Sequence, residues 1–148
     1  MGKQLTIGQF ADAAGISADT LRYYEKLKLI KATTRSRSGY RLYDPEMLSV
    51  VHFINGAKAL QFTLVEIKQL LTLNTSDQAR CSQVLKHTEV KIAEAESKIR
   101  ELKAIKKVLG NILKQCPGDD TSAKACPILD HLQKPKTQPV KVRKASVK

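Results

Sequence analysis

The chain has 148 residues, enough for one compact domain with an extension or for two small modules. Its formal net charge of +12 predicts a polyanionic partner, and an aromatic content of 5% without tryptophan argues against a large aromatic-lined ligand cavity. Half of the excess charge lies in residues 133–148, which hold only basic charges, so we expect a disordered basic tail there. No signal peptide or membrane span is visible, so we predict a cytoplasmic protein with no membrane partner.

The first 30 residues have the pattern of two short helices joined by a glycine turn. Thr6 and Gln9 have the spacing of a capping box before the first helix, and Gly15 is expected to end that helix. Ser17 is placed to cap a second helix over residues 18–29. This pattern predicts a helix-turn-helix, whose second helix enters the major groove in DNA-binding proteins.

A basic hairpin is predicted directly after the second helix. Residues 31–44 are rich in basic residues, serine and threonine. Ser38 and Gly39 mark a turn, and residues 40–43 alternate between apolar and polar as a strand does. The segment therefore predicts a β-hairpin wing.

Three further helices are predicted. Asp44 and Pro45 are a strong helix start, and Thr63 with Glu66 is a second capping box, so residues 45–73 are expected to form a helix pair. A long helix over about 77–114 carries apolar residues at steps of three and four, as in a coiled coil. A narrow apolar stripe buries little alone, so we expect a homodimer; the alternative is packing against the N-terminal domain. The predicted seam comprises Leu85, Thr88, Ile92, Ala95, Ile99, Leu102, Ile105, Leu109 and Ile112.

Hydroxyl and guanidinium side chains gather on the predicted second helix and on the hairpin. Such groups bind phosphate oxygens, and arginine can also bind guanine edges. The alternative is a solvated basic face, and we expect Tyr24 or Tyr43 to lie in the core. We predict that double-stranded DNA is bound by Ser17, Thr20, Arg22, Tyr23, Arg35, Arg37, Tyr40 and Arg41.

Residues 5–73 resemble a known family almost continuously. The stretches TIGQFADAAGISADTLRYYEKLKLI and RSRSGYRLYDPEMLSVVHFINGAKALQFTLVEIKQLL are similar to the N-terminal domain of the MerR family of transcriptional regulators. The resemblance implies a winged helix-turn-helix, with the second helix pair bracing the wing. By motif match it implies DNA contacts from Arg22 and Tyr23 on the helix and from Arg35, Tyr40 and Arg41 on the wing. One departure is Ile30-Lys31-Ala32, where many members have a proline.

The three cysteines, Cys81, Cys116 and Cys126, are candidate metal ligands. Cys81 and Cys116 lie near opposite ends of the long helix, roughly 50 Å apart at about 1.5 Å per residue, so they cannot bind one ion within a chain. The resemblance implies an antiparallel dimer, in which Cys81 of one chain approaches Cys116 and Cys126 of the other. Each dimer would then hold two equivalent three-thiolate sites. The alternative is that all three are packed or solvated thiols.

Thiolates select soft or borderline ions, and three of them form an anionic trigonal site that suits Zn(II), Cd(II), Hg(II) or Pb(II). In the resembled family a cysteine matching Cys81 is typical of divalent-metal sensors. The zinc-type pattern would add a second adjacent cysteine and a loop histidine, where this chain has Pro117 and Asp119 or Asp120. We predict one divalent ion per site and leave open which ion, and whether an aspartate or His131 adds a fourth ligand.

The predicted function is metal-dependent transcriptional activation of resistance or efflux genes. The resemblance implies that metal binding changes the twist of a promoter held by the dimer, so that RNA polymerase is affected indirectly through the DNA. The alternative is a thiol redox sensor on the same scaffold, which the helix dipole at Cys116 disfavours. No nucleophile–base set or open zinc motif appears, so we predict that the chain is not an enzyme.

The predicted fold is mainly α. A winged helix-turn-helix DNA-binding domain with a small β-hairpin wing is expected over residues 1–74. A long antiparallel coiled-coil dimerisation helix follows over 75–115. Residues 116–132 are expected to form a metal-binding loop with a short terminal helix, and residues 133–148 the basic disordered tail.

Overall fold

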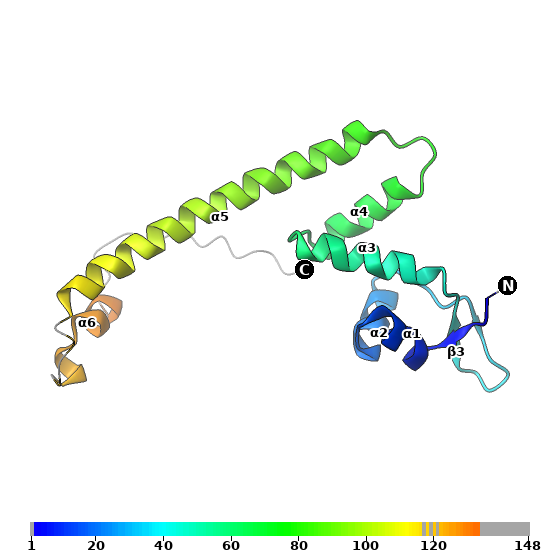
Figure 1. Cartoon of the computed structure of the whole chain (residues 1–148), viewed down its shortest axis with the longest axis horizontal. Helices are drawn as coiled ribbons and strands as arrows, with labels where there is room; N and C mark the ends of the chain where they lie inside the picture. The colour runs from blue at the N-terminus through cyan, green and yellow to red at the C-terminus, as the bar shows by residue number, and fades with distance from the viewer. Residues whose placement is uncertain (1, 117, 119, 121, 134–148) are drawn as a thin grey trace. The chain divides into compact units, whose positions relative to one another are not determined.

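The computed structural model describes residues 2–116, 118, 120 and 122–133, and is mainly helical with one small sheet, as predicted (Figure 1). The chain divides into two compact units, Met1–His87 and Thr88–Lys148, and helix α5 (Cys81–Gln115) runs from the first into the second. All but the first residue of the predicted basic tail lies outside the described residues. Within the described part of the chain, no helix is both long and apolar enough to cross a membrane.

Local capping forms the first helix as the sequence predicts. Helix α1 (Ile7–Ala14) begins with a capping box, in which Thr6 and Gln9 each accept the other's backbone N–H with a side-chain oxygen. Gly15 ends the helix at a φ of 68°. This left-handed conformation carries no steric cost for glycine, which has no Cβ.

Helix α2 (Ala18–Lys26) is shorter than predicted. It begins at Ser17, whose Oγ accepts the N–H of Thr20 at 3.0 Å. It ends at Lys26 rather than at residue 29, because the backbone at Lys28 turns to a φ of 58°. This turn directs the next two residues, Leu29 and Ile30, into the core, where both are buried.

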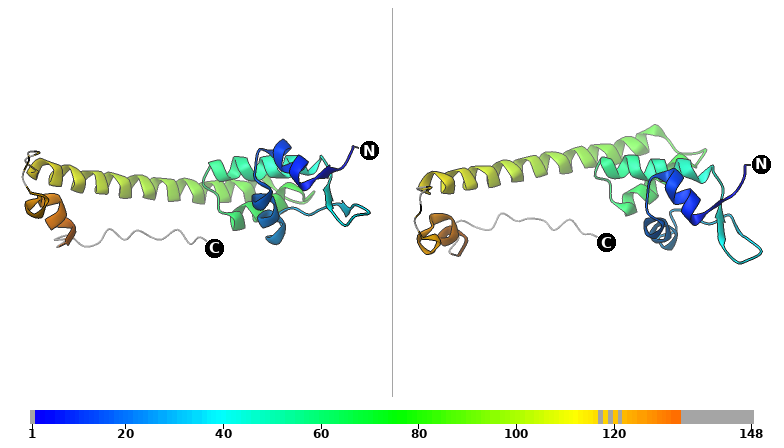
Figure 2. Two further views of the ribbon diagram at one scale, coloured as in Figure 1. Left: turned by 90° about the horizontal axis from the view of Figure 1, so that it is seen from below. Right: turned by 60° about the horizontal axis from the view of Figure 1, so that its bottom comes forward.

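The wing belongs to a three-stranded antiparallel sheet with the order β1-β3-β2. Strands β2 (Thr34–Arg35) and β3 (Arg41–Tyr43) form the predicted hairpin, whose loop projects away from the helices (Figure 2). The strand β1 (Leu5–Thr6) was not predicted, because two residues are too few to show alternation. It pairs with the other edge of β3, so the wing strand is held from both sides.

The second helix pair comprises α3 (Met47–Ala59) and α4 (Leu64–Asn74). The predicted start of α3 at Asp44 and Pro45 was wrong, because these residues form a turn in which the Asp44 carbonyl accepts the Met47 N–H at 3.0 Å. The predicted capping box of α4 is confirmed: Thr63 donates its N–H to Glu66 Oε2 at 2.7 Å, and its hydroxyl oxygen accepts the N–H of Glu66.

One apolar core joins the helix-turn-helix, the wing and the second helix pair. The rings of Phe10 on α1 and Tyr43 on β3 lie 5.1 Å apart. Tyr24 and Tyr43 are both buried, where the sequence led us to expect one of the two. Tyr24 and Leu21 are the buried residues of α2, so the opposite side of this helix faces solvent. The largest fully buried side chains are Tyr24, Tyr43, Phe10, Leu21, Ile54, Ile67 and Val51.

The second unit is built on the C-terminal part of α5. After the helix ends, the chain forms a single turn of 3-10 helix, η1 (Ala123–Ala125), and the short helix α6 (Pro127–Gln133). Figure 1 shows η1 and α6 beside the end of α5. Ile112 of α5 is buried in this unit, and Ile128 of α6 faces the same end of α5.

Candidate nucleic-acid interface and cysteine site

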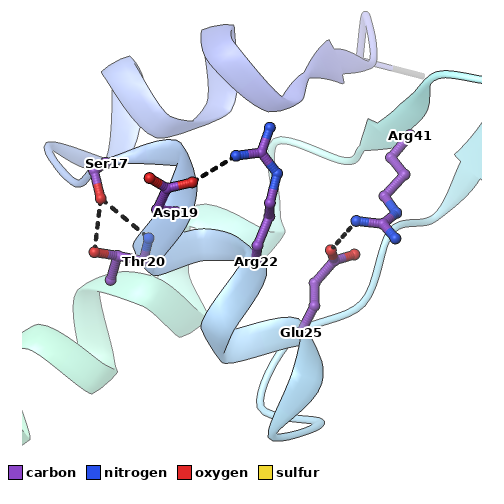
Figure 3. Close-up of polar contacts among 6 residues, drawn as sticks. All are labelled: Ser17, Asp19, Thr20, Arg22, Glu25 and Arg41. Atoms are coloured by element: carbon purple, nitrogen blue, oxygen red, sulfur yellow. Dashed lines mark hydrogen bonds and ion pairs between the residues drawn. The ribbon is translucent and has the colours of Figure 1, made fainter.

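Four of the predicted DNA-binding residues lie on α2 or at its start: Ser17 is the N-cap, and Thr20, Arg22 and Tyr23 belong to the helix. Figure 3 shows the first three. The hydroxyls of Ser17 and Thr20 lie 2.8 Å apart, and Ser17 also caps the helix, so both serve the helix start. Arg22 donates from Nη1 to Asp19 Oδ1 at 2.7 Å, and both side chains are exposed. Tyr23, the next residue, is 48% exposed. The guanidinium of Arg22 and the phenol of Tyr23 are therefore exposed at neighbouring positions of α2, whereas Thr20 is half-buried at the helix start.

The wing presents a second group of basic side chains. Arg35 donates from Nη1 to the Gly39 carbonyl at 3.2 Å, which braces the hairpin loop. Arg37 is exposed, and Tyr40 is 71% exposed at the end of the loop. The Tyr40 N–H donates to Ser36 Oγ at 3.1 Å, so hydrogen bonds within the loop hold its shape.

Arg41 connects the wing to the helix. Its Nη1 lies 3.1 Å from Glu25 Oε2, near the end of α2 (Figure 3). The sequence does not point to Glu25, because a contact across 16 positions leaves no local signal. The sequence does carry a signal for the strand side of this contact: alternation along β3 places Arg41 and Tyr43 on one face.

Two of the three cysteines lie together. Cys116 follows the last residue of α5, and Cys126 precedes α6. Backbone N–H groups of Leu129 and then Ile128 lower the pKa of the Cys126 thiol. Burial opposes this effect, and a hydrogen bond with the Cys116 side chain makes the smallest contribution to lowering the pKa. The two thiols therefore lie close to each other in the second unit.

Cys81 is exposed and is the first residue of α5. Among the residues that the structure describes, no group of three or more His, Cys, Asp or Glu side chains is placed to hold a metal ion. Two thiols are fewer than the three or four ligands of most thiolate metal sites, so Cys116 and Cys126 alone would not complete one. Asp119 lies outside the described residues, Asp120 is exposed and His131 is half-buried.

An apolar groove of about 500 Å³ runs along the end of α5 in the second unit. It contains a single charged residue, Lys106, and α6 contributes Ile128 to it. The other lining residues are Leu102, Ile105, Leu109, Gly110, Ile112 and Leu113. Most of them overlap the predicted coiled-coil seam, so the seam and the groove form one apolar surface.

Comparison with protein-family models decides the family. The model of the MerR family regulatory protein matches residues 6–43, and the model "MerR, DNA binding" matches residues 48–112. The chain belongs to the MerR family. The two matches span the helix-turn-helix, the wing, the second helix pair and most of α5, so the predicted family and fold are both confirmed.

Relatives of this MerR-family chain include metal-responsive regulators. The mercuric resistance operon regulatory protein of Bacillus cereus is 38% identical over 128 residues, which cover 86% of this chain and 96% of that protein. The structure also resembles that of PbrR691 from Ralstonia metallidurans CH34 in complex with lead(II), with a TM-score of 0.76 and 32% identity over 86% of this chain and 98% of that one. The mercury(II) complex of MerR from Bacillus megaterium MB1 matches with a TM-score of 0.64 and 34% identity, covering 84% and 95% of the two chains.

In this MerR-family chain the predicted seam is largely exposed. Its side chains are 51–64% exposed at Ile99, Ile92, Leu85, Leu109 and Leu102, whereas Ile112 is 5% exposed because it lies near α6. Burying leucine and isoleucine side chains lowers the free energy by about 25 cal/mol per Å² of apolar surface removed from water. The exposed stripe is therefore a surface that a second helix could cover.

Proposed function

We propose that the chain is a metal-dependent transcriptional regulator that binds double-stranded promoter DNA as a homodimer and activates resistance or efflux genes. The proposed organisation keeps the predicted boundaries: a DNA-binding domain over residues 1–74, a dimerisation helix over 75–115, a metal-binding segment over 116–132 and a basic tail over 133–148. RNA polymerase is a partner only through the shape of the promoter DNA.

The proposed DNA contacts come from α2 and the wing. The exposed side chains of α2 face the major groove, and the arginines of the wing grip the phosphates beside it. The exposure of Arg22, Tyr23, Arg37 and Tyr40 and the net charge of +12 support this assignment. The proposed contact residues are Ser17, Thr20, Arg22, Tyr23, Arg35, Arg37, Tyr40 and Arg41.

The proposed metal site joins two subunits. Cys116 and Cys126 of one chain supply two thiolates, and Cys81 of the partner subunit supplies the third. The observation that carries this proposal is the contact between Cys116 and Cys126 at the junction of α5 and α6, with Cys81 exposed at the other end of α5. Thiolate ligands suit a divalent soft ion, Zn, Cd, Pb or Hg, with one ion per site and two per dimer.

The position of Cys81 links the site to the DNA-binding domain. Cys81 begins α5, and residues 75–80 connect it to α4 of the winged domain. Drawing Cys81 toward the partner's Cys116 and Cys126 would therefore pull on the segment that supports the second helix pair. Distorting promoter DNA costs a few kcal/mol, and the site must bind more tightly in the activating conformation by at least that amount.

A metal panel tests the proposal. The reduced dimer is titrated with Zn(II), Cd(II), Pb(II), Hg(II) and Cu(I), while promoter transcription and thiolate charge-transfer absorbance are recorded. We expect a divalent ion to raise transcription with a midpoint that matches the absorbance change. A preferential response to Cu(I) would refute the divalent assignment, and DNA binding without any metal response would refute metal sensing.

One observation favours the redox alternative. The lowered pKa of Cys126 and the neighbouring Cys116 are features of thiols that form a reversible disulfide. The same titration distinguishes the two, because a redox sensor would lose its response under strict reduction and regain it with a mild oxidant. A metal response that persists under strict reduction would exclude the redox mechanism.

A further inference from the structure

The contact between Glu25 and Arg41 differs from the other ion pair on α2. Asp19 and Arg22 lie one helical turn apart, with side chains 92% and 53% exposed. Exposed pairs of this kind contribute little, since water screens both charges. Glu25 is only 15% exposed and reaches Arg41 on a different element, 16 positions along the chain. The pair of Glu25 and Arg41 therefore joins helix α2 to the wing.

Tyr43 places a second group of the wing strand beside the same carboxylate. Residues 41 and 43 share a face of β3, because side chains alternate along a strand. Tyr43 is fully buried, and its hydroxyl makes no hydrogen bond of good geometry within the described part of the chain. Burial first and the Glu25 carboxylate second raise the pKa of Tyr43 to about 12. Glu25 thus lies against two side chains of the strand that carries the wing.

Arg41 retains the capacity to bind another anion while it is held by Glu25. Its side chain is 45% exposed, and one of its five N–H donors is used in this contact. A planar guanidinium can donate to a carboxylate from one nitrogen and to a phosphate from another, which a lysine ammonium does with less geometric control. Glu25 therefore fixes the direction in which the free donors of Arg41 point.

We propose that Glu25 is a positioning residue for DNA recognition: its carboxylate orients Arg41 toward the phosphate backbone and holds the wing at a fixed place relative to α2. This inference rests on the proposed DNA-binding function and adds to it a residue that itself repels phosphate. A free arginine binds any phosphate within reach, whereas an oriented arginine favours DNA whose phosphates match its direction. Glu25 accordingly lowers affinity for arbitrary DNA and raises affinity for the operator.

The test compares Glu25→Gln with a matched control. Glutamine keeps the size of the side chain and removes its charge, and Asp12→Asn removes an exposed charge from α1 in the same domain. The dissociation constants of each are measured for a duplex selected from a random pool by the wild-type dimer and for a scrambled duplex of equal length. Asp12→Asn should tighten both complexes slightly, because it only reduces repulsion. Glu25→Gln should weaken operator binding about tenfold, the size of one charge-assisted contact, while binding to the scrambled duplex stays equal or tightens.

A double-mutant cycle shows whether Glu25 acts through Arg41. We expect Glu25→Gln combined with Arg41→Gln to bind the operator no more weakly than Arg41→Gln alone. Arg41→Lys, which keeps the charge and loses the fork, should also weaken operator binding.

Several results would overturn the proposal. Additive losses in the cycle would mean that Glu25 acts by another route. A Glu25→Gln variant that changes both affinities in the same direction as Asp12→Asn would reduce its role to net charge, and no change at all would remove any role. A parallel fall of both affinities with a lower melting temperature would make the pair purely structural. Failure of the wild-type dimer to bind any duplex would instead refute the proposed function.

Discussion

The winged domain and α5 differ in how they bury their apolar side chains. The first contains a closed core, in which side chains from α1, α2, β3, α3 and α4 are fully buried. Within the described part of the chain, Ile112 is the only buried residue of α5. The other seam residues of this helix face solvent or the apolar groove. A region that buries its own apolar residues is stable within one chain, whereas a region that exposes a regular apolar stripe depends on a second surface. The exposed seam residues of α5 therefore remain available for contact with a second surface, whereas the core of the winged domain is complete within one chain.

The largest expected effect concerns the cysteines, because a shared site should fail completely when either subunit loses its part. Cys81→Ser and the double variant Cys116→Ser/Cys126→Ser should each abolish the metal response while leaving DNA binding intact. Mixed dimers made from the two variants should regain one complete site, and with it about half of the bound metal per dimer. Bound metal and charge-transfer absorbance of purified mixed dimers measure this.

An unchanged response in Cys81→Ser would contradict the cross-subunit site. Mixed dimers that bind no metal, although both parent variants still dimerise, would contradict it as well. A matched control is Cys81→Ser mixed with wild type, which should also retain one complete site.

Removing a core side chain should damage only the winged domain. Phe10→Ala deletes a fully buried ring that packs against Tyr43, and such changes cost about 3–5 kcal/mol through lost burial and a residual cavity. The melting temperature of the winged domain should fall and operator affinity should fall with it. Urea denaturation followed by circular dichroism measures the loss. A variant destabilised by less than about 1 kcal/mol would contradict the closed core.

A charge on the seam should damage the assembly and leave the winged domain folded. Ile99→Asp places a carboxylate on the predicted seam, and Val90→Asp places the same charge on α5 away from it; the two parent side chains are 51% and 56% exposed. A carboxylate buried at a helix interface is strongly unfavourable, so we expect Ile99→Asp to weaken the dimer at least about 100-fold. Sedimentation equilibrium distinguishes the variants. Equal effects of the two would show that the seam is not the interface.

Elements with local signals were predictable, and contacts between distant residues were not. The capping boxes at Thr6 and Thr63 and the left-handed Gly15 depend on residues three or four positions apart, so the sequence predicts them directly. The start of α3 was misplaced, because Asp44 and Pro45 suit a turn as well as a helix start. The two-residue strand β1 and the contact of Glu25 with Arg41 depend on where β3 lies in the fold, which no local pattern records.

The candidate site divides in the same way. The residue type made Cys116 and Cys126 candidate ligands, although their spacing alone is a weak signal, and the structure brings the two into contact. The role of Cys81 depends on a second chain, so neither the sequence nor a single chain tests it. The exposed arginines of the wing were predictable from composition, whereas the carboxylate that holds Arg41 was missed because a sequence search for DNA contacts favours positive charge.

The smallest expected effect is a change of stability with pH that originates at Tyr43, within the winged domain. Burial and then Glu25 raise the pKa of Tyr43 from 10.0 to about 12 in the folded chain. The folded state therefore holds the phenol proton more tightly than the unfolded state. The resulting stability is fully present below pH 10.0 and is lost as pH rises toward about 12. A shift of this size corresponds to a loss on the order of 2 kcal/mol.

Tyr43→Phe should lack this loss, so the difference in urea midpoint between wild type and variant should shrink or reverse between pH 9 and about 11.5. Glu25→Gln should show a smaller loss than wild type, because one of the causes of the raised pKa is gone. Parallel curves for wild type and Tyr43→Phe would show that the phenol is not held in this environment, and would remove one of the two contacts that place Glu25 against the wing strand.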